Sequence, residues 1–357
     1  MHASANPSRL AIYLALSYAL LILYATLHPL SGWQHSGLPV FDYLIAPFPR
    51  YFRVEDLVVN VLGYIPLGFV AVAALPFRRG PAILIATLLA GLLSLSVETL
   101  QNFLPTRVSS NVDLGCNLAG GFIGAVFGAL FAHRLFDRNG WLQRWRNSSI
   151  IPGRTGDIGL ILLCLWLLTQ FMPESIVFAS GDMRSLLDLG TPLAFDPERF
   201  ILFETLLVAT SIVAVGLIAR CMMTSANPLP ILVLLALALA AKSLATWSFF
   251  VPGAPTGWLT PGARDGMMFG LPALAATLLL PRLAQHALAG MALLAATTLA
   301  NLIPDNPFLL VDQRLLAYGN FLNFHGLTHI VASTWPFVAL GYLSALGLWR
   351  GEHLHNR

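Results

Sequence analysis

The stretch DLVVNVLGYIPLGFVAVAALPF, residues 56–77, decides the fold class of this chain. It opens with Asp56 and Asn60, and Tyr64 is the only polar side chain after them. About 20 apolar residues cross the hydrocarbon core of a bilayer as a helix, because a helix satisfies its own backbone hydrogen bonds. The stretch therefore predicts a membrane-spanning helix with two polar residues at its start.

The rest of the chain has the same character. Of 357 residues, 57% are hydrophobic and only 10% are charged, with a mean hydropathy of +0.73, whereas soluble domains have about 25% charged residues. Runs long enough to span occur near residues 10–30, 57–77, 82–104, 114–132, 158–172, 200–223, 229–251, 267–280, 283–303 and 327–349. We expect an all-α, polytopic transmembrane bundle of about ten spans, in which the first run is a retained helix and not a signal peptide.

The segment 147–156 contains Ser, Pro and Gly residues and is the best boundary between two halves. It predicts a four-helix domain over residues 1–146, a linker over 147–156 and a second transmembrane domain of about six helices over 157–357. The loops expected on the side of both termini contain more Arg than those on the other side. By the positive-inside rule, this asymmetry predicts an inner-membrane protein with both termini in the cytoplasm.

The octet Asp-Leu-x-x-Asn-x-x-Gly occurs at residues 56–63 and again at residues 113–120. On a helix, Asp and Asn four residues apart lie on one face, and here both copies enter from the predicted outer side. One interpretation is an internal repeat that brings Asp56, Asn60, Asp113 and Asn117 to a common site. The other is convergent capping, because an Asp at the start of a helix accepts backbone N–H bonds.

Between the two copies, Glu98 lies in the run 82–104 and shares a helix face with Ser94 and Gln101. It lies roughly 9 Å inside the predicted boundary, where an ionised carboxylate is costly unless it is paired. Glu98 therefore marks a functional site, or it forms a purely structural ion pair with Arg107 or Arg53.

The order of these residues resembles the VanZ-like family of bacterial membrane proteins. The resemblance is carried by Asn60-x-x-Gly63-x-x-Pro66, Ser96-x-Glu98-x-x-Gln101 with Pro105-x-Arg107, and Asp113-x-x-x-Asn117-x-x-Gly120, and it covers roughly residues 10–135. It implies a four-helix membrane module of the cell envelope, in a family named for a member linked to glycopeptide antibiotic resistance. The resemblance implies six site positions: Asn60, Glu98, Gln101, Arg107, Asp113 and Asn117. Asp56 joins them through the repeated octet.

Two further patterns lead to structural expectations. Gly120, Gly124 and Gly128 form a ladder that lets another helix approach closely. Lys242 lies deep in a predicted span and needs a partner, for which Glu204 is the first candidate and Asp265 the second. The sequence predicts no metal site and no cofactor, and it contains no nucleotide-binding or nucleic-acid-binding motif.

We expect the seven polar residues to form one outward-opening pocket that binds an anionic, lipid-linked envelope intermediate without established catalysis. Membrane lipids, a lipid-linked precursor or another membrane protein are the expected partners. The alternative is an enzyme or flippase-like carrier, in which Arg107 holds phosphate and Glu98 or Asp113 moves protons as the catalytic candidate. In a third interpretation, Glu98 and Lys242 are the coupling charges of an ion-coupled transporter.

Overall fold

The computed structural model describes residues 9–28, 30–35, 37, 39–47, 54–77, 79–105, 107–136, 140–172, 174–184, 186–187, 189–249, 254–304 and 325–355. The described residues form two compact units, the first reaching to Arg146 and the second beginning at Asn147. Each unit is described by itself below. The short helix α5 (Trp141–Ser149) contains the boundary between them.

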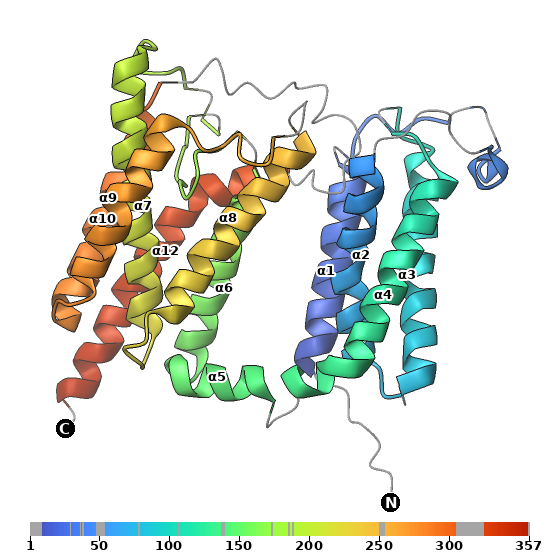
Figure 1. Ribbon diagram of the computed structural model, residues 1–357, viewed down its shortest axis with the longest axis horizontal. Coiled ribbons are helices and arrows are strands. Elements are labelled where there is room, and N and C mark those ends of the chain that lie inside the picture. Colours follow the sequence, from blue (N-terminus) through green and yellow to red (C-terminus); the bar gives the residue numbers. More distant parts are fainter. Residues whose placement is uncertain are drawn as a thin grey trace, which may run out of the picture. The chain divides into compact units, whose positions relative to one another are not determined.

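Four long helices build the first unit: α1 (Arg9–Leu27), α2 (Val54–Ala74), α3 (Arg79–Gln101) and α4 (Asn111–Phe136). They lie side by side with alternating direction, so that α2 runs parallel to α4 (Figure 1). A single 3-10 turn, η1 (Asp42–Ile45), lies in the connection between α1 and α2. As a result, the starts of α2 and α4 and the ends of α1 and α3 lie at one end of the unit, which we call the polar end.

The closest packing in the first unit is between α2 and α4. At three glycines of α4, an added Cβ atom would collide with a backbone oxygen of α2. The pairs are Gly120 with Val61, Gly124 with Ile65 and Gly128 with Phe69. Only glycine allows two backbones to approach so closely, and the small-residue ladder predicted from the sequence is confirmed as a helix-packing surface. The adjoining core consists of Ala71, Ala86 and Ala125 from α2, α3 and α4.

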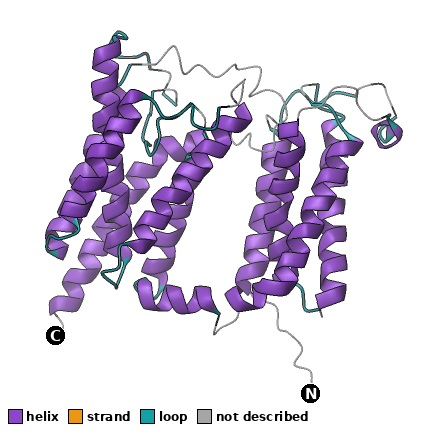
Figure 2. Ribbon diagram, in the orientation of Figure 1, coloured by secondary structure: helices purple, strands orange, loops and turns teal. Residues whose placement is uncertain are grey.

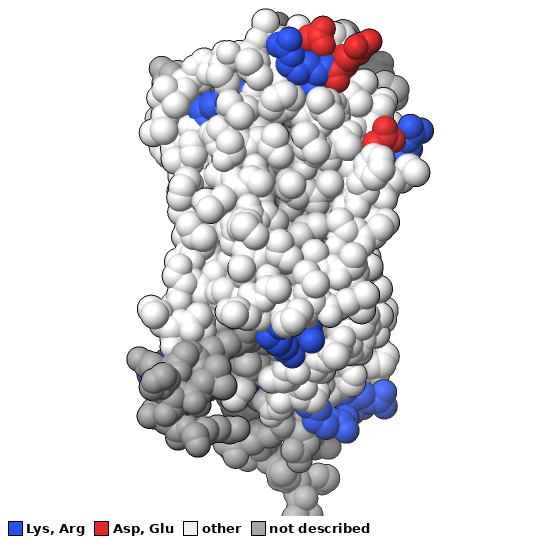
Figure 3. All heavy atoms as spheres, turned by 90° about the vertical axis from the view of Figure 1, so that its left-hand side faces the viewer, with Lys and Arg blue, Asp and Glu red and all other residues white. Residues whose placement is uncertain are grey.

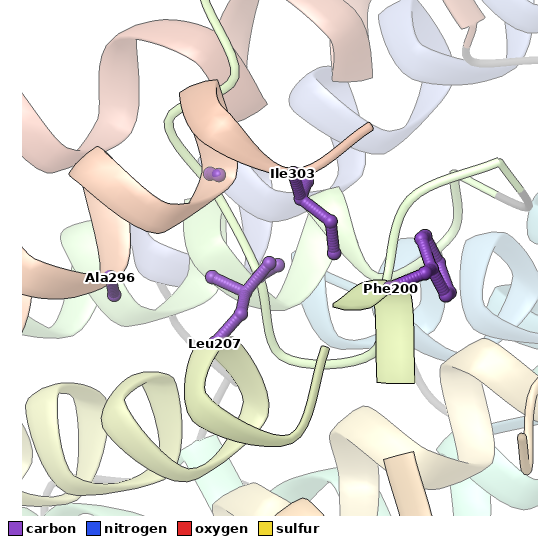
Figure 4. Packing of buried hydrophobic residues seen from close by; sticks show 6 residues of the cluster. Phe200, Leu207, Ala296 and Ile303 are labelled. Atoms are coloured by element: carbon purple, nitrogen blue, oxygen red, sulfur yellow. The ribbon is translucent and has the colours of Figure 1, made fainter. Parts of the chain in front are cut away.

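The second unit consists of six helices: α6 (Arg154–Thr169), α7 (Pro197–Met222), α8 (Leu229–Phe249), α9 (Pro261–Thr277), α10 (Arg282–Leu302) and α12 (His325–His355). Helix α7 packs against both α9 and α10, and α6 packs against α12. The core between α7 and α10 contains Phe200, Leu207, Ala296 and Ile303 (Figure 4). Ala179 also belongs to this core, although it comes from a non-helical segment.

That segment, residues 170–172 and 174–184, packs among the helices of the second unit. Val177 and Phe178 are almost fully buried, and Phe178 adopts a positive φ of 64°. The Gly181 amide donates to the Ala332 carbonyl of α12, and Asn301 of α10 donates to the Gly181 carbonyl. Backbone groups that are buried outside a helix need partners elsewhere in the protein, and α10 and α12 supply them here.

The α7–α9 pair repeats the packing register of the α2–α4 pair. Three glycines of α9, again four residues apart, face backbone atoms of α7 that are four residues apart. The pairs are Gly262 with Ile201, Gly266 with Thr205 and Gly270 with Ala209. Beside the first glycine of each ladder lies a larger residue, Tyr64 in the first unit and Glu204 in the second. Each unit thus contains two parallel helices joined by the same glycine-on-carbonyl contact.

Each of the ten predicted runs corresponds to a helix, and the described residues contain no named strand (Figure 2). Seven helices are long and apolar enough to cross a membrane, while α6, α9 and the apolar part of α1 are shorter. On the face drawn in Figure 3, charged residues lie toward the two ends and a broad uncharged band separates them. The all-α transmembrane bundle is confirmed, and the chain is a multi-pass membrane protein.

Candidate functional site

At the polar end of the first unit, two side chains donate hydrogen bonds to backbone carbonyls at the end of α1. Gln101 at the end of α3 donates to the carbonyl of Thr26 at 3.0 Å. Arg107, in the connection from α3 to α4, donates through Nη2 to the carbonyl of His28. Both side chains are buried. Because α1 ends there, its last carbonyls have no partner within the helix, and these two residues satisfy them.

The two octets meet between α2 and α4. Asn60 donates through Nδ2 to Oδ1 of Asp113 at 2.8 Å, so a side chain of the first octet binds a side chain of the second. Asp56 is exposed, and its carboxylate interacts electrostatically with that of Asp113. Asp56, Asn60 and Asp113 of the predicted site therefore lie together, although the two copies of the octet have different surroundings.

Glu98 is 3% exposed and binds the start of α4. Its Oε2 accepts the backbone N–H of Ser110 at 2.8 Å, and its carbonyl accepts the hydroxyl of Ser109 at 2.6 Å. No ion pair joins Glu98 to Arg107 in the part of the chain that the structure describes. Arg53 lies outside the described residues. The Glu98–Arg107 pair, left open by the sequence, is therefore wrong, because an orphan N–H at a helix start takes the carboxylate instead.

Asn117 lies one turn below Asp113 on the same face of α4 and is 5% exposed. Its Nδ2 donates to the hydroxyl of Ser94 on α3 at 2.9 Å. Its Oδ1 is buried and has no hydrogen-bond partner among the described residues. Asn117 thus joins α4 to α3 and keeps one unused acceptor.

Arg107 has the most unusual environment at the polar end. The side chain is 7% exposed, yet Nε and Nη1 have no hydrogen-bond partner among the described residues. Burial lowers the pKa of the guanidinium to about 10, so it stays protonated at neutral pH. A buried cation with unused N–H donors is costly unless an anion accepts them.

In the second unit, the expected pairing of Lys242 with Glu204 or Asp265 is wrong. The ammonium of Lys242 donates to the Met172 carbonyl at 2.7 Å and to both the carbonyl and the hydroxyl of Ser175. Glu204 instead accepts the Thr260 hydroxyl at 2.6 Å, at the start of α9. Asp265 pairs with its neighbour Arg264 at the surface. Lys242 therefore binds the connection between α6 and α7, mainly through backbone carbonyls that the sequence could not single out as its partners.

Sequence reasoning also missed the residues that complete the polar end. Ser110 caps α4, because its hydroxyl accepts the amides of Val112 and Asp113 at 3.2 and 3.3 Å. The pattern Ser110-x-x-Asp113 ahead of an apolar run is a capping signature, so the sequence contained a signal for it. The carbonyls of Thr26 and His28 have no such signal. Among the described residues, no three His, Cys, Asp or Glu side chains lie close enough together to hold a metal ion.

Comparison with known proteins gives a family match within the first unit. Searches of curated proteins and of solved structures found no match. Residues 10–132 match the family described as VanZ/LLP1. The match covers α1 to α4, except for the first residue of α1 and the last four residues of α4. The VanZ-like resemblance is therefore confirmed for the N-terminal part of the chain, the part that contains every residue of the polar end.

Proposed function

We propose that the polar end of the first unit binds the anionic headgroup of a lipid-linked envelope intermediate, without established catalysis. The observation that carries the proposal is Arg107, which is buried and protonated and leaves Nε and Nη1 without a partner among the described residues. A phosphate oxygen is the acceptor that a guanidinium binds best, because its planar N–H groups match the geometry of the anion.

A lipid-attached ligand fits the surroundings of this cation. Val108, next to Arg107, is 84% exposed, and Leu100, the second-last residue of α3, is also exposed. In a membrane protein such side chains contact acyl chains. A lipid whose headgroup reaches Arg107 can therefore keep its chain along α3 without entering the protein.

Substitution of Arg107 tests the proposal. Lys keeps the charge but loses the planar donor geometry, so Arg107→Lys should weaken binding of phosphatidylglycerol about tenfold. The measurement is native mass spectrometry of the full chain in detergent, titrated with phosphatidylglycerol. Arg79→Lys is the matched control, because Arg79 is exposed at the other end of α3 and should bind like the wild type.

Wild-type affinity of Arg107→Lys, together with no lipid co-purifying with the wild-type protein, would refute the lipid-phosphate proposal. The four-helix unit would then be a scaffold whose polar end only joins helices.

A further inference from the structure

The connection between α1 and α2 crosses the end of α3. The Gln34 amide donates to the carbonyl of Phe103, which lies just beyond the last residue of α3. Farther along the connection, the Val40 carbonyl accepts a hydrogen bond from the side chain of Asn102 at 3.2 Å. The connection is therefore level with the end of α3 as far as Val40.

After Val40 the chain turns down along the side of α3. Tyr43 of η1 is buried, and its hydroxyl lies 3.1 Å from the hydroxyl of Thr99. The same hydroxyl donates to the Leu95 carbonyl at 3.5 Å. Because α3 ends at Gln101, Thr99 and Leu95 lie about 3 and 9 Å below its end. The hydroxyl of Tyr43 therefore lies below the end of α3.

This depth corresponds to the boundary of the hydrocarbon core. Helix α3 has 23 residues and is long and apolar enough to cross a membrane. At 1.5 Å per residue it is about 35 Å long, and the hydrocarbon core is about 30 Å thick. A helix of that length, centred in the bilayer, extends about 2.5 Å beyond the core at each end. The Tyr43 hydroxyl lies lower than that, so we expect η1 to lie among lipids.

The exposed side chains of the turn suit this position. Phe41, Leu44 and Ile45 are 57%, 39% and 84% exposed. Apolar side chains are unfavourable in water, whereas contact with acyl chains removes them from it. Asp42 is the only Asp, Glu, Lys or Arg among the described residues of the connection, and it is exposed. A carboxylate stays hydrated at the headgroups but not at the bilayer centre, so the turn belongs to the interface.

Contacts on two sides hold the turn in this orientation. Tyr43 binds α3, and Asn111 at the start of α4 donates to the Ala46 carbonyl at 2.8 Å. The turn also packs against α4. Its exposed side chains therefore cannot all move inward without breaking these contacts.

We propose that η1 is an interfacial anchor, which is held on α3 by Tyr43 and inserts Phe41, Leu44 and Ile45 among the acyl chains of the leaflet at the polar end. The partner of this surface is lipid, because the turn lies at membrane depth. The proposal does not depend on the headgroup site at Arg107, since it uses none of the residues of that site.

Spin labels on the full chain in bilayers of phosphatidylethanolamine and phosphatidylglycerol test the depth of the turn. The label is attached to Ile45→Cys in a protein whose three native cysteines are replaced by alanine. Its collision rates are measured with oxygen, which concentrates in hydrocarbon, and with a nickel chelate, which stays in water. Gln34→Cys, an exposed position level with the end of α3, is the control for water. Leu92→Cys, an exposed position within α3, is the control for lipid.

The ratio of oxygen to nickel collisions at Ile45→Cys should exceed that at Gln34→Cys on the order of tenfold and approach that at Leu92→Cys. A ratio equal to that at Gln34→Cys would place the turn in water and overturn the proposal. A label that neither reagent reaches would show that protein covers the turn, which would overturn it as well. Phe41→Cys repeats the measurement, so that the result does not depend on one variant.

Replacement of Tyr43 tests what holds the turn. In the labelled Ile45→Cys protein, Tyr43→Ala removes the contacts with α3 and should raise the nickel collision rate about threefold. Tyr13→Ala is the matched control, because Tyr13 is a tyrosine of α1 that is 66% exposed, and it should leave the rate unchanged. Equal rates in the two variants would overturn the anchoring of η1 on α3.

Discussion

At the residue scale, the polar side chains of the first unit bind backbone at helix ends as much as they bind each other. Glu98 binds the start of α4, and Gln101 and Arg107 bind the end of α1. Each of these contacts satisfies a group that a helix cannot satisfy itself. Capping and ligand binding are therefore not exclusive, because Arg107 performs the first with Nη2 and keeps Nε and Nη1 for the second.

Glu98→Gln separates binding from proton transfer. A Gln oxygen can still accept the Ser110 amide, so the variant should express normally and bind lipid within about threefold of the wild type. Glu98→Ala removes that acceptor and should lower the free energy of unfolding by about 1–3 kcal/mol. Thermal unfolding and lipid titration of both variants measure this. Loss of binding in a folded Glu98→Gln protein would favour the acid–base or ion-coupled alternatives.

The pKa of Arg107 predicts how binding depends on pH. Its folded pKa of about 10 lies below the ordinary value of 12.5, so the charged form is present throughout neutral pH and is lost as pH rises through 10. Phosphatidylglycerol keeps its charge in this range. Its binding should be constant from pH 6 to 8 and decline toward pH 10 in the wild type. A decline between pH 6 and 8 would show that another group controls the site.

At the element scale, each unit contains one helix pair, α2–α4 or α7–α9, in which glycines four residues apart face backbone atoms of the other helix. In each, one glycine ladder packs onto the carbonyls of the helix two positions earlier in the chain. The contact explains why α2 and α4, although not adjacent in sequence, are the most closely packed helices of their unit.

Leucine in the ladders should destabilise each unit. A side chain at Gly124 or Gly266 would collide with the backbone of the facing helix, which should cost about 1–3 kcal/mol or more. Gly115→Leu and Gly290→Leu are the matched controls, because a Cβ at either position meets open space. Thermal unfolding in detergent compares Gly124→Leu and Gly266→Leu with them. Equal stability of a ladder variant and its control would mean that the close approach is not needed.

The elements were largely predictable from sequence, and their contacts only in part. Hydropathy located ten helices because lipid forces an apolar run to be helical. The octets indicated that Asn60 and Asp113 share a surface, which their hydrogen bond bears out. The buried connection between α6 and α7 was not predictable, because side chains such as Lys242, Asn301 and Ser333 bind its backbone carbonyls, which no side-chain pattern specifies. The same reason makes the partner of Lys242 a surprise.

At the scale of the whole molecule, the Arg distribution predicts that both termini are cytoplasmic. If all ten helices that correspond to the predicted runs cross the membrane, the number of crossings is even, and a reporter enzyme fused after Arg357 should report a cytoplasmic location. A fusion before Arg9 is the control for the other terminus. A periplasmic signal after Arg357 would show an odd number of crossings. In that case one of the short helices, α6 or α9, would be the first candidate for a helix that does not cross the membrane.

The central claim is that Arg107 is a buried anion receptor at the polar end of a VanZ-like unit. The most direct test is an experimental structure of the full chain in nanodiscs of phosphatidylethanolamine and phosphatidylglycerol. The account predicts a headgroup phosphate within hydrogen-bond distance of Nε or Nη1 of Arg107. A carboxylate of the protein on those two nitrogens, with no lipid at the polar end, would contradict it.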